Sequence, residues 1–156
     1  MLEIHQAKET DIAEIVAIVN DAFQVENDFR AGNRTSTAEI RQLMEGSQFL
    51  KAMHDQQMAG VVLVRLNEKT GYLGMLAVRR GLQRLGIGRA LIEAAENYCR
   101  SRGCTRMTLS TGSVRRELLD RYHKLGYTIT SIDPVSSDGR FTKPIEIVKM
   151  AKAIKA

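Results

Sequence analysis

Apolar and polar side chains alternate along this chain with two different periods, one typical of strands and one typical of helices. Residues 2–6 alternate apolar and polar side chains, as a strand with one buried face does. Residues 11–23 repeat apolar side chains at helical spacing, which predicts an amphipathic helix. Residues 49–54 and 58–66 are apolar runs on either side of the polar turn 55–57, and this pattern predicts a β-hairpin.

The whole pattern predicts elements in the order βααβββαβαββ, which is a mixed α/β fold. The predicted helices cover residues 11–23, 36–46, 88–102 and 113–126, and the predicted strands cover residues 2–6, 49–54, 58–66, 72–78, 106–110, 127–132 and 145–150. Asp11 with Glu14 and Ser36 with Glu39 have the spacing of a capping box, and Ser113 is expected to cap the last helix.

Composition narrows the class of protein. The 156 residues suit one domain over residues 1–156, and 44% hydrophobic with 26% charged residues is typical of a soluble globular protein. No apolar run approaches the roughly 20 residues that span a bilayer, and the first residues lack the pattern of a signal peptide. Two cysteines, Cys99 and Cys104, do not make a disulfide framework, which favours free thiols and a cytoplasmic location.

The net charge of +5 is concentrated in one segment. Residues 79–124 hold eleven Lys or Arg and four Asp or Glu, whereas the rest of the chain holds twelve basic and fourteen acidic residues. A nucleic acid or a phosphate-bearing ligand such as coenzyme A would each suit this segment. Only Tyr98 and Tyr122 are aromatic there, so no platform for base stacking is evident.

A glycine-rich stretch between the strand 72–78 and the helix 88–102 predicts an anion site. Glycines let backbone N–H groups approach a phosphate, and the positive end of the helix dipole then holds it. A Walker loop is excluded because Gly86 is followed by Ile87 and Gly88 rather than by Lys and Ser or Thr. A Rossmann fingerprint is excluded because Leu91 stands where the third glycine is needed.

The remaining pattern, Gln-x-x-Gly-x-Gly from Gln83 to Gly88, resembles the pyrophosphate loop of the GCN5-related N-acetyltransferase (GNAT) family. The Tyr-x-x-x-Gly-Tyr segment from Tyr122 to Tyr127 is similar to a second family segment, and the likeness covers residues 72–127. This resemblance implies a central mixed sheet flanked by helices. It also implies an acyltransferase that moves the acetyl group of acetyl-CoA to a primary amine by direct attack in a ternary complex.

The resemblance also implies which residues bind acetyl-CoA. The backbone of Leu76 and Val78 would pair with the pantetheine arm beside a β-bulge that Gly74 would mark. Arg79 and Arg80 are candidates for contact with the 3′-phosphate, and plain solvated charge is an equally good interpretation of both, so this contact is left open. The pyrophosphate would be held by Gln83, Arg84, Gly86, Ile87, Gly88 and Arg89.

Tyr122 is the catalytic residue that the resemblance implies. A phenol with a pKa near 10 stays protonated at neutral pH and can protonate the leaving thiolate. A buried tyrosine of an amphipathic helix is the alternative for this position. His123 diverges from Tyr122 by about 100° on the helix and is expected at the surface. The strand 72–78 holds no carboxylate to act as general base, which leaves water and backbone carbonyls, or Glu26 or Asp28.

The acceptor amine is not identified by the sequence. Its pocket is expected from the segments 26–34 and 133–143, because such loops set specificity within a fold. The expected partners are acetyl-CoA and a small-molecule or peptide amine, with a homodimer left open and neither nucleic acid nor membrane expected. No metal site is expected, because the three histidines lack ligand spacing with the cysteines. Two alternatives remain: a non-catalytic acyl-CoA sensor and a basic nucleic-acid-binding protein.

Overall fold

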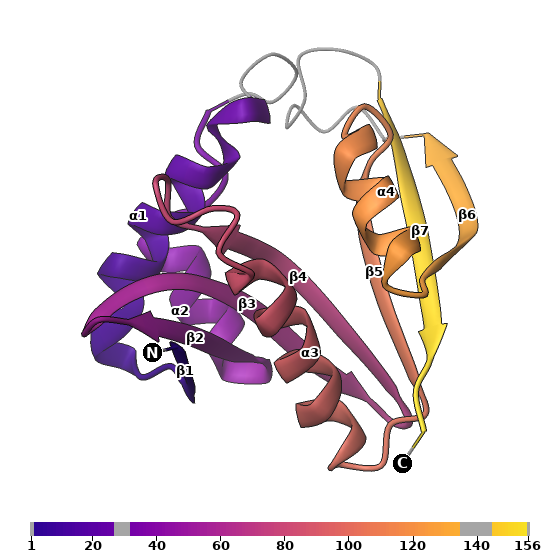
Figure 1. Ribbon diagram of the computed structural model, residues 1–156, viewed down its shortest axis with the longest axis horizontal. Helices are drawn as coiled ribbons and strands as arrows, with labels where there is room; N and C mark the ends of the chain where they lie inside the picture. The colour runs from indigo at the N-terminus through magenta and orange to yellow at the C-terminus, as the bar shows by residue number, and fades with distance from the viewer. Residues whose placement is uncertain (1, 27–31, 135–144, 156) are drawn as a thin grey trace.

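The computed structural model describes residues 2–26, 32–134 and 145–155. Within these ranges the strands form one sheet in the order β1-β2-β3-β4-β5-β7-β6 (Figure 1). The strands are β1 (Leu2–Gln6), β2 (Gln48–His54), β3 (Gln57–Asn67), β4 (Thr70–Val78), β5 (Arg106–Gly112), β6 (Thr128–Pro134) and β7 (Glu146–Ala153). The helices are α1 (Ile12–Ala22), α2 (Thr37–Gly46), α3 (Ile87–Arg100) and α4 (Arg116–Lys124), with 3-10 turns at Glu9–Asp11 and Phe23–Glu26.

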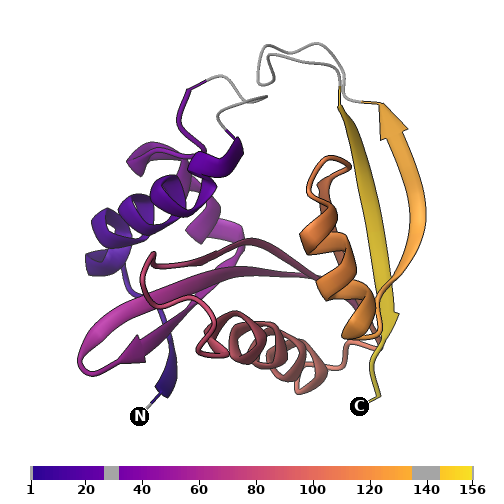
Figure 2. The ribbon, with the colours of Figure 1, turned by 45° about the horizontal axis from the view of Figure 1, so that its top comes forward.

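The predicted order of helices and strands is confirmed. Buried side chains of α1 and α2 pack on one face of the sheet, and those of α3 and α4 pack on the other face. Each face therefore has its own apolar core, and Figure 2 shows the helices on the two sides of the sheet. All neighbouring strands run antiparallel except β4 and β5, which run parallel.

Two of the predicted helix caps are wrong, because other groups bind the side chains that were expected to cap the helices. The Asp11 carboxylate accepts a hydrogen bond from the backbone N–H of Lys8 and one from the Lys51 ammonium, each at 2.8 Å, and does not cap α1. Ser113 accepts a hydrogen bond from the backbone N–H of Glu146 on β7 instead of capping α4.

The parallel pair β4 and β5 stays together over a short distance only. Their register contains three pairs, Thr70–Arg106, Gly71–Met107 and Tyr72–Thr108. Beyond Tyr72 the two strands diverge, so that the sheet opens as a V with α4 on one arm (Figures 1 and 2). The edge of β4 that faces β5 therefore has no ladder partner in β5 from residue 73 to residue 78.

The open stretch of β4 contains the expected bulge, one residue further along than Gly74. Val62 of β3 lies opposite two residues of β4, Met75 and Leu76, between the pairs Val61–Ala77 and Leu63–Gly74. Met75 adopts a φ of 48°, in the left-handed region that non-glycine residues rarely enter. This bulge turns the strand where the gap to β5 opens.

The three-pair junction depends on close packing at Gly71. A Cβ atom at this position would lie 2.5 Å from Cys99 Sγ and 2.6 Å from Met107 Sδ. Cys99 of α3 is fully buried as a free thiol, and burial raises the pKa of this thiol to about 12. The absence of a side chain at Gly71 therefore lets α3 pack directly on the junction.

We predict that Gly71→Ala lowers the free energy of unfolding by about 1–3 kcal/mol, the usual cost of overpacking a close-packed core. Gly46→Ala is the matched control, because nothing lies within 4 Å of a Cβ placed at Gly46. Urea denaturation followed by circular dichroism measures both variants. Equal stability of Gly71→Ala and wild type would show that the junction adapts freely.

Candidate active site

The divergence of β4 and β5 opens a cleft of about 1540 Å³. Its walls come from the open part of β4, the loop before α3, the end of β5 and the inner side of α4. All nine residues predicted for cofactor binding and catalysis line this cleft: Leu76, Val78, Gln83, Arg84, Gly86, Ile87, Gly88, Arg89 and Tyr122. Residues that are 46 positions apart in the sequence thus share one surface.

The N-terminus of α3 has the backbone geometry of an anion site. Gly86 is the N-cap, with a φ of 78°, and it has no side chain that could accept from the first turn. The first hydrogen bond of the helix runs from the N–H of Ala90 to the carbonyl of Gly86 at 3.0 Å. The N–H groups of residues 87–89 therefore precede the helical ladder and are directed at the cleft end of α3.

Gly88 keeps the space over this helix end open. A Cβ at Gly88 would lie 3.7 Å from Val78 Cγ2 and 3.9 Å from Arg121 Nη1, which are ordinary contact distances. The fold itself therefore tolerates a side chain there. What a larger side chain would remove is the room for a ligand against the backbone of the first turn.

Tyr122 is 5% exposed and contributes to the wall of the cleft from the last turn of α4. Burial raises the pKa of Tyr122 to about 12, although the nearby charges of Arg121 and Arg115 act to lower it and Tyr72 adds a small rise. The phenol is therefore fully protonated at neutral pH and available as a proton donor.

A buried polar cluster lies behind Tyr122. The Tyr127 hydroxyl donates a hydrogen bond of 2.8 Å to the Glu96 carboxylate, which also accepts from the Lys152 ammonium at 3.1 Å. The ring of Tyr127 packs edge-on against Tyr122, with centroids 6.1 Å apart. Burial, with the neighbouring Glu96, raises the pKa of Tyr127 well above its usual value. Tyr127 is therefore a core residue, as expected.

Tyr72 lines the cleft from the last paired position of β4, and the sequence pattern did not single it out. A Cβ at Gly74 would lie 2.8 Å from the Tyr72 hydroxyl oxygen, so Gly74 makes room for this ring rather than forming the bulge. The Arg65 guanidinium stacks on the ring at 4.8 Å from its centroid. This second phenol reaches the site because β4 and β5 diverge directly after Tyr72.

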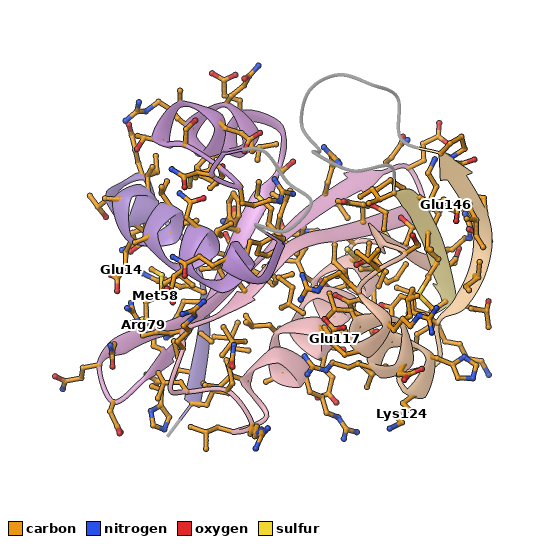
Figure 3. All side chains as sticks on the ribbon, turned by 90° about the horizontal axis from the view of Figure 1, so that it is seen from above. Glu14, Met58, Arg79, Glu117, Lys124 and Glu146 are labelled. Carbon is orange, nitrogen blue, oxygen red and sulfur yellow. The ribbon has the colours of Figure 1, made fainter. Side chains whose placement is uncertain are left out.

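The two arginines expected at the 3′-phosphate do not line the cleft. The Arg79 guanidinium bonds to the Glu14 carboxylate and to the carbonyl of Met58, each at 2.9 Å, and Figure 3 shows these three residues together. Arg80 lies 3.7 Å from the Asp21 carboxylate. Arg79 therefore connects the end of β4 to α1, and both arginines bind carboxylates away from the cleft lining.

The side chains of the two carboxylates considered as general base fall outside the structural description. Asp28 lies outside the described residues, and Glu26 is described by its backbone alone. The loops expected to form the acceptor pocket are described in part, and Phe23, Asn33 and Arg34 line the cleft on the side next to the first of these loops.

Over residues 2–26, 32–134 and 145–155, no cluster of side chains suited to holding a metal ion is found, and no helix has the length and apolar character to cross a membrane.

The family model of the acetyltransferase (GNAT) family matches residues 12–127, which is well over half of the sequence. The chain therefore belongs to the GNAT acetyltransferase family. A search of curated proteins returned no match.

Many solved structures share the fold. The ribosomal-protein-S18-alanine N-acetyltransferase from Escherichia coli has a TM-score of 0.80 at 22% identity, over 100% of this chain and 96% of that one. Ard1 from Thermoplasma volcanium has a TM-score of 0.83 at 19% identity, over 99% of both chains. A GNAT acetyltransferase from Elizabethkingia anophelis with acetyl-CoA bound has a TM-score of 0.74 at 17% identity, over 98% of both chains. These matches confirm the expected fold.

We predict that the protein loses stability in alkali, because folding raises the pKa of both Tyr122 and Tyr127. An unfolded phenol titrates at about pH 10, so the unfolded state releases its protons first and the free energy of unfolding falls above that pH. Each tyrosine contributes a slope of about 1.4 kcal/mol per pH unit, which for Tyr122 ends near the folded pKa of about 12.

Urea midpoints measured between about pH 8 and pH 11 test this slope. Tyr122→Phe and Tyr127→Phe should each flatten the alkaline limb, whatever they cost at neutral pH. If both variants kept the wild-type slope, other groups would cause the alkaline loss.

Proposed function

We propose that this protein is an N-acetyltransferase that binds acetyl-CoA in the cleft and transfers the acetyl group to a primary amine. The observation that carries the proposal is the meeting, in one cleft, of an open strand edge, an uncapped helix end and a buried phenol. These three features suit the three parts of the donor. Membership of the GNAT family and the acetyl-CoA held by the Elizabethkingia anophelis neighbour support the choice of donor.

Each part of acetyl-CoA has a proposed partner. The pyrophosphate would bind the N–H groups at the start of α3, with Gln83, Arg84 and Arg89 around it. The amide groups of the pantetheine arm would pair with the backbone near Leu76 and Val78, in the place that a neighbouring strand leaves open. The thioester would then lie next to the bulge and within the wall that Tyr122 helps to form.

The proposed reaction is a direct attack within a ternary complex. The neutral amine forms a C–N bond to the thioester carbonyl carbon, and backbone N–H groups at the bulge stabilise the developing oxyanion. The C–S bond then breaks, and the Tyr122 hydroxyl gives its proton to the leaving thiolate. The amine releases one proton to water, and Tyr122 regains a proton from water. The products are the N-acetylated amine and coenzyme A.

The acceptor would enter from the side of the cleft that Phe23, Asn33 and Arg34 line. Phe23 packs against the apolar cluster of α1 and α2, and the Arg34 guanidinium lies 5.3 Å from the centroid of its ring. This side therefore belongs to the face of the sheet opposite α3. Acceptor and donor would thus approach the bulge from opposite faces of the sheet. Such an arrangement favours a ternary complex over a covalent acetyl-enzyme.

We predict that Gly88→Val raises the Kd for acetyl-CoA at least about tenfold, because the new side chain occupies the space over the first turn of α3. Leu85→Ala is the control, since Leu85 belongs to the same loop but is 57% exposed and outside the cleft lining. Titration calorimetry gives the Kd values, and thermal melting shows that both variants fold. Unchanged affinity in folded Gly88→Val would remove the loop from the donor site.

We predict that Tyr122→Phe lowers kcat by about 10²–10⁴ while leaving the Kd for acetyl-CoA unchanged, because it removes the proton donor and keeps the ring. Coenzyme A release is measured with spermidine, free amino acids, and peptides with a free N-terminal alanine or serine. His123→Ala is the control, as its side chain is exposed on the same helix.

The outcomes of this assay separate the alternatives. Turnover that vanishes in Tyr122→Phe and persists in His123→Ala supports the proposed mechanism. Acetyl-CoA binding without turnover on any of these amines would favour a sensor module. Full turnover by Tyr122→Phe would make the tyrosine a core residue and leave thiolate protonation to water.

A further inference from the structure

Arg121 of α4 reaches across the cleft to the first turn of α3. Its Nη1 atom would lie 3.9 Å from a Cβ placed at Gly88, and both residues line the cleft. Cα–Cβ bonds of a helix tilt toward its N-terminus. The space next to Arg121 is therefore the space over the free N–H groups of residues 87–89.

The Arg121 guanidinium makes no side-chain hydrogen bond or ion pair in the described part of the chain, although its charge helps to lower the pKa of Glu117 on the same helix. The neighbouring Arg115, in contrast, bonds to the Glu117 carboxylate at 2.7 Å. Arg79 is likewise committed, to Glu14. An exposed guanidinium next to an uncapped helix end offers its fork of donors to an anion bound there.

We propose that Arg121 binds the pyrophosphate of acetyl-CoA from the side opposite α3, as a clamp that the glycine loop alone does not provide. This inference rests on the proposed donor and adds a residue from a second helix to its binding site. The backbone N–H groups of residues 87–89 contact one side of the diphosphate, and the guanidinium contacts the other with charge-assisted hydrogen bonds.

The clamp joins donor binding to the position of the catalytic phenol. Arg121 directly precedes Tyr122, and α4 belongs to the arm of the sheet that diverges from the α3 arm. A diphosphate held between Gly88 and Arg121 would hold the two arms at a fixed separation. The charge of Arg121 also acts to lower the pKa of the Tyr122 phenol. One residue would therefore interact with both the bound anion and the proton donor.

The test compares Arg121→Met with Arg116→Met, a change of equal charge on the same helix. Arg116 is exposed and does not line the cleft. Calorimetry measures the Kd of coenzyme A and of dephospho-coenzyme A, which lacks the 3′-phosphate and keeps the pyrophosphate. Arg121→Met should raise both Kd values by the same factor, about 10- to 100-fold, and Arg116→Met should change them by less than about threefold. Arg121→Lys should restore part of the affinity.

Any different result would contradict the proposed role of Arg121. A penalty in Arg121→Met that disappears with dephospho-coenzyme A would place Arg121 at the 3′-phosphate. Equal penalties in Arg121→Met and Arg116→Met would reduce the effect to long-range charge. Wild-type affinity in Arg121→Met would leave the arginine outside the site. Failure of the wild-type protein to bind either ligand would instead overturn the proposed function itself, and the clamp with it.

Discussion

The parting of β4 and β5 after three residue pairs is the constraint on which the rest of the site depends. Backbone N–H and C=O groups inside a sheet need partners, and the edge of β4 beyond Tyr72 finds none in β5. An extended ligand with amide groups can supply them. The same parting leaves room for Tyr122 on one arm and for the end of α3 on the other. Backbone topology, rather than any single side chain, thus creates the cleft.

A sheet that opens in this way needs another connection between its arms. One apolar cluster contains residues of β4 and α3 together with residues of β5, α4 and β7. Next to this apolar cluster, the Glu96 carboxylate of α3 accepts hydrogen bonds from the Lys152 ammonium of β7 and from the Tyr127 hydroxyl. A buried ion pair contributes little net stability, but removal of one partner leaves the other charge buried without compensation. This cluster therefore favours one fixed separation of the arms over a range of separations.

The order of elements could be predicted because each has a strong period, and Ser36 caps α2 as its spacing indicates. The loop residues could be predicted because strand, glycines and helix are contiguous in the chain. Tyr72 and Arg121 could not, because one reaches the cleft through the divergence of two strands and the other through the packing of α4 opposite α3. Asp11 was misassigned because Lys51, forty residues away, binds its carboxylate.

Met75 shows what the open sheet costs. A non-glycine residue in the left-handed region raises the energy of the folded state by about 1–2 kcal/mol. A glycine would relieve that backbone strain, but the Met75 side chain is buried in the core beneath α1. A sequence that restored regular pairing of β3 and β4 here would relieve this strain and remove the bulge that turns the strand. The strained residue also belongs to the wall of the cleft, so a substitution that only relieved the strain would change the shape of the site as well.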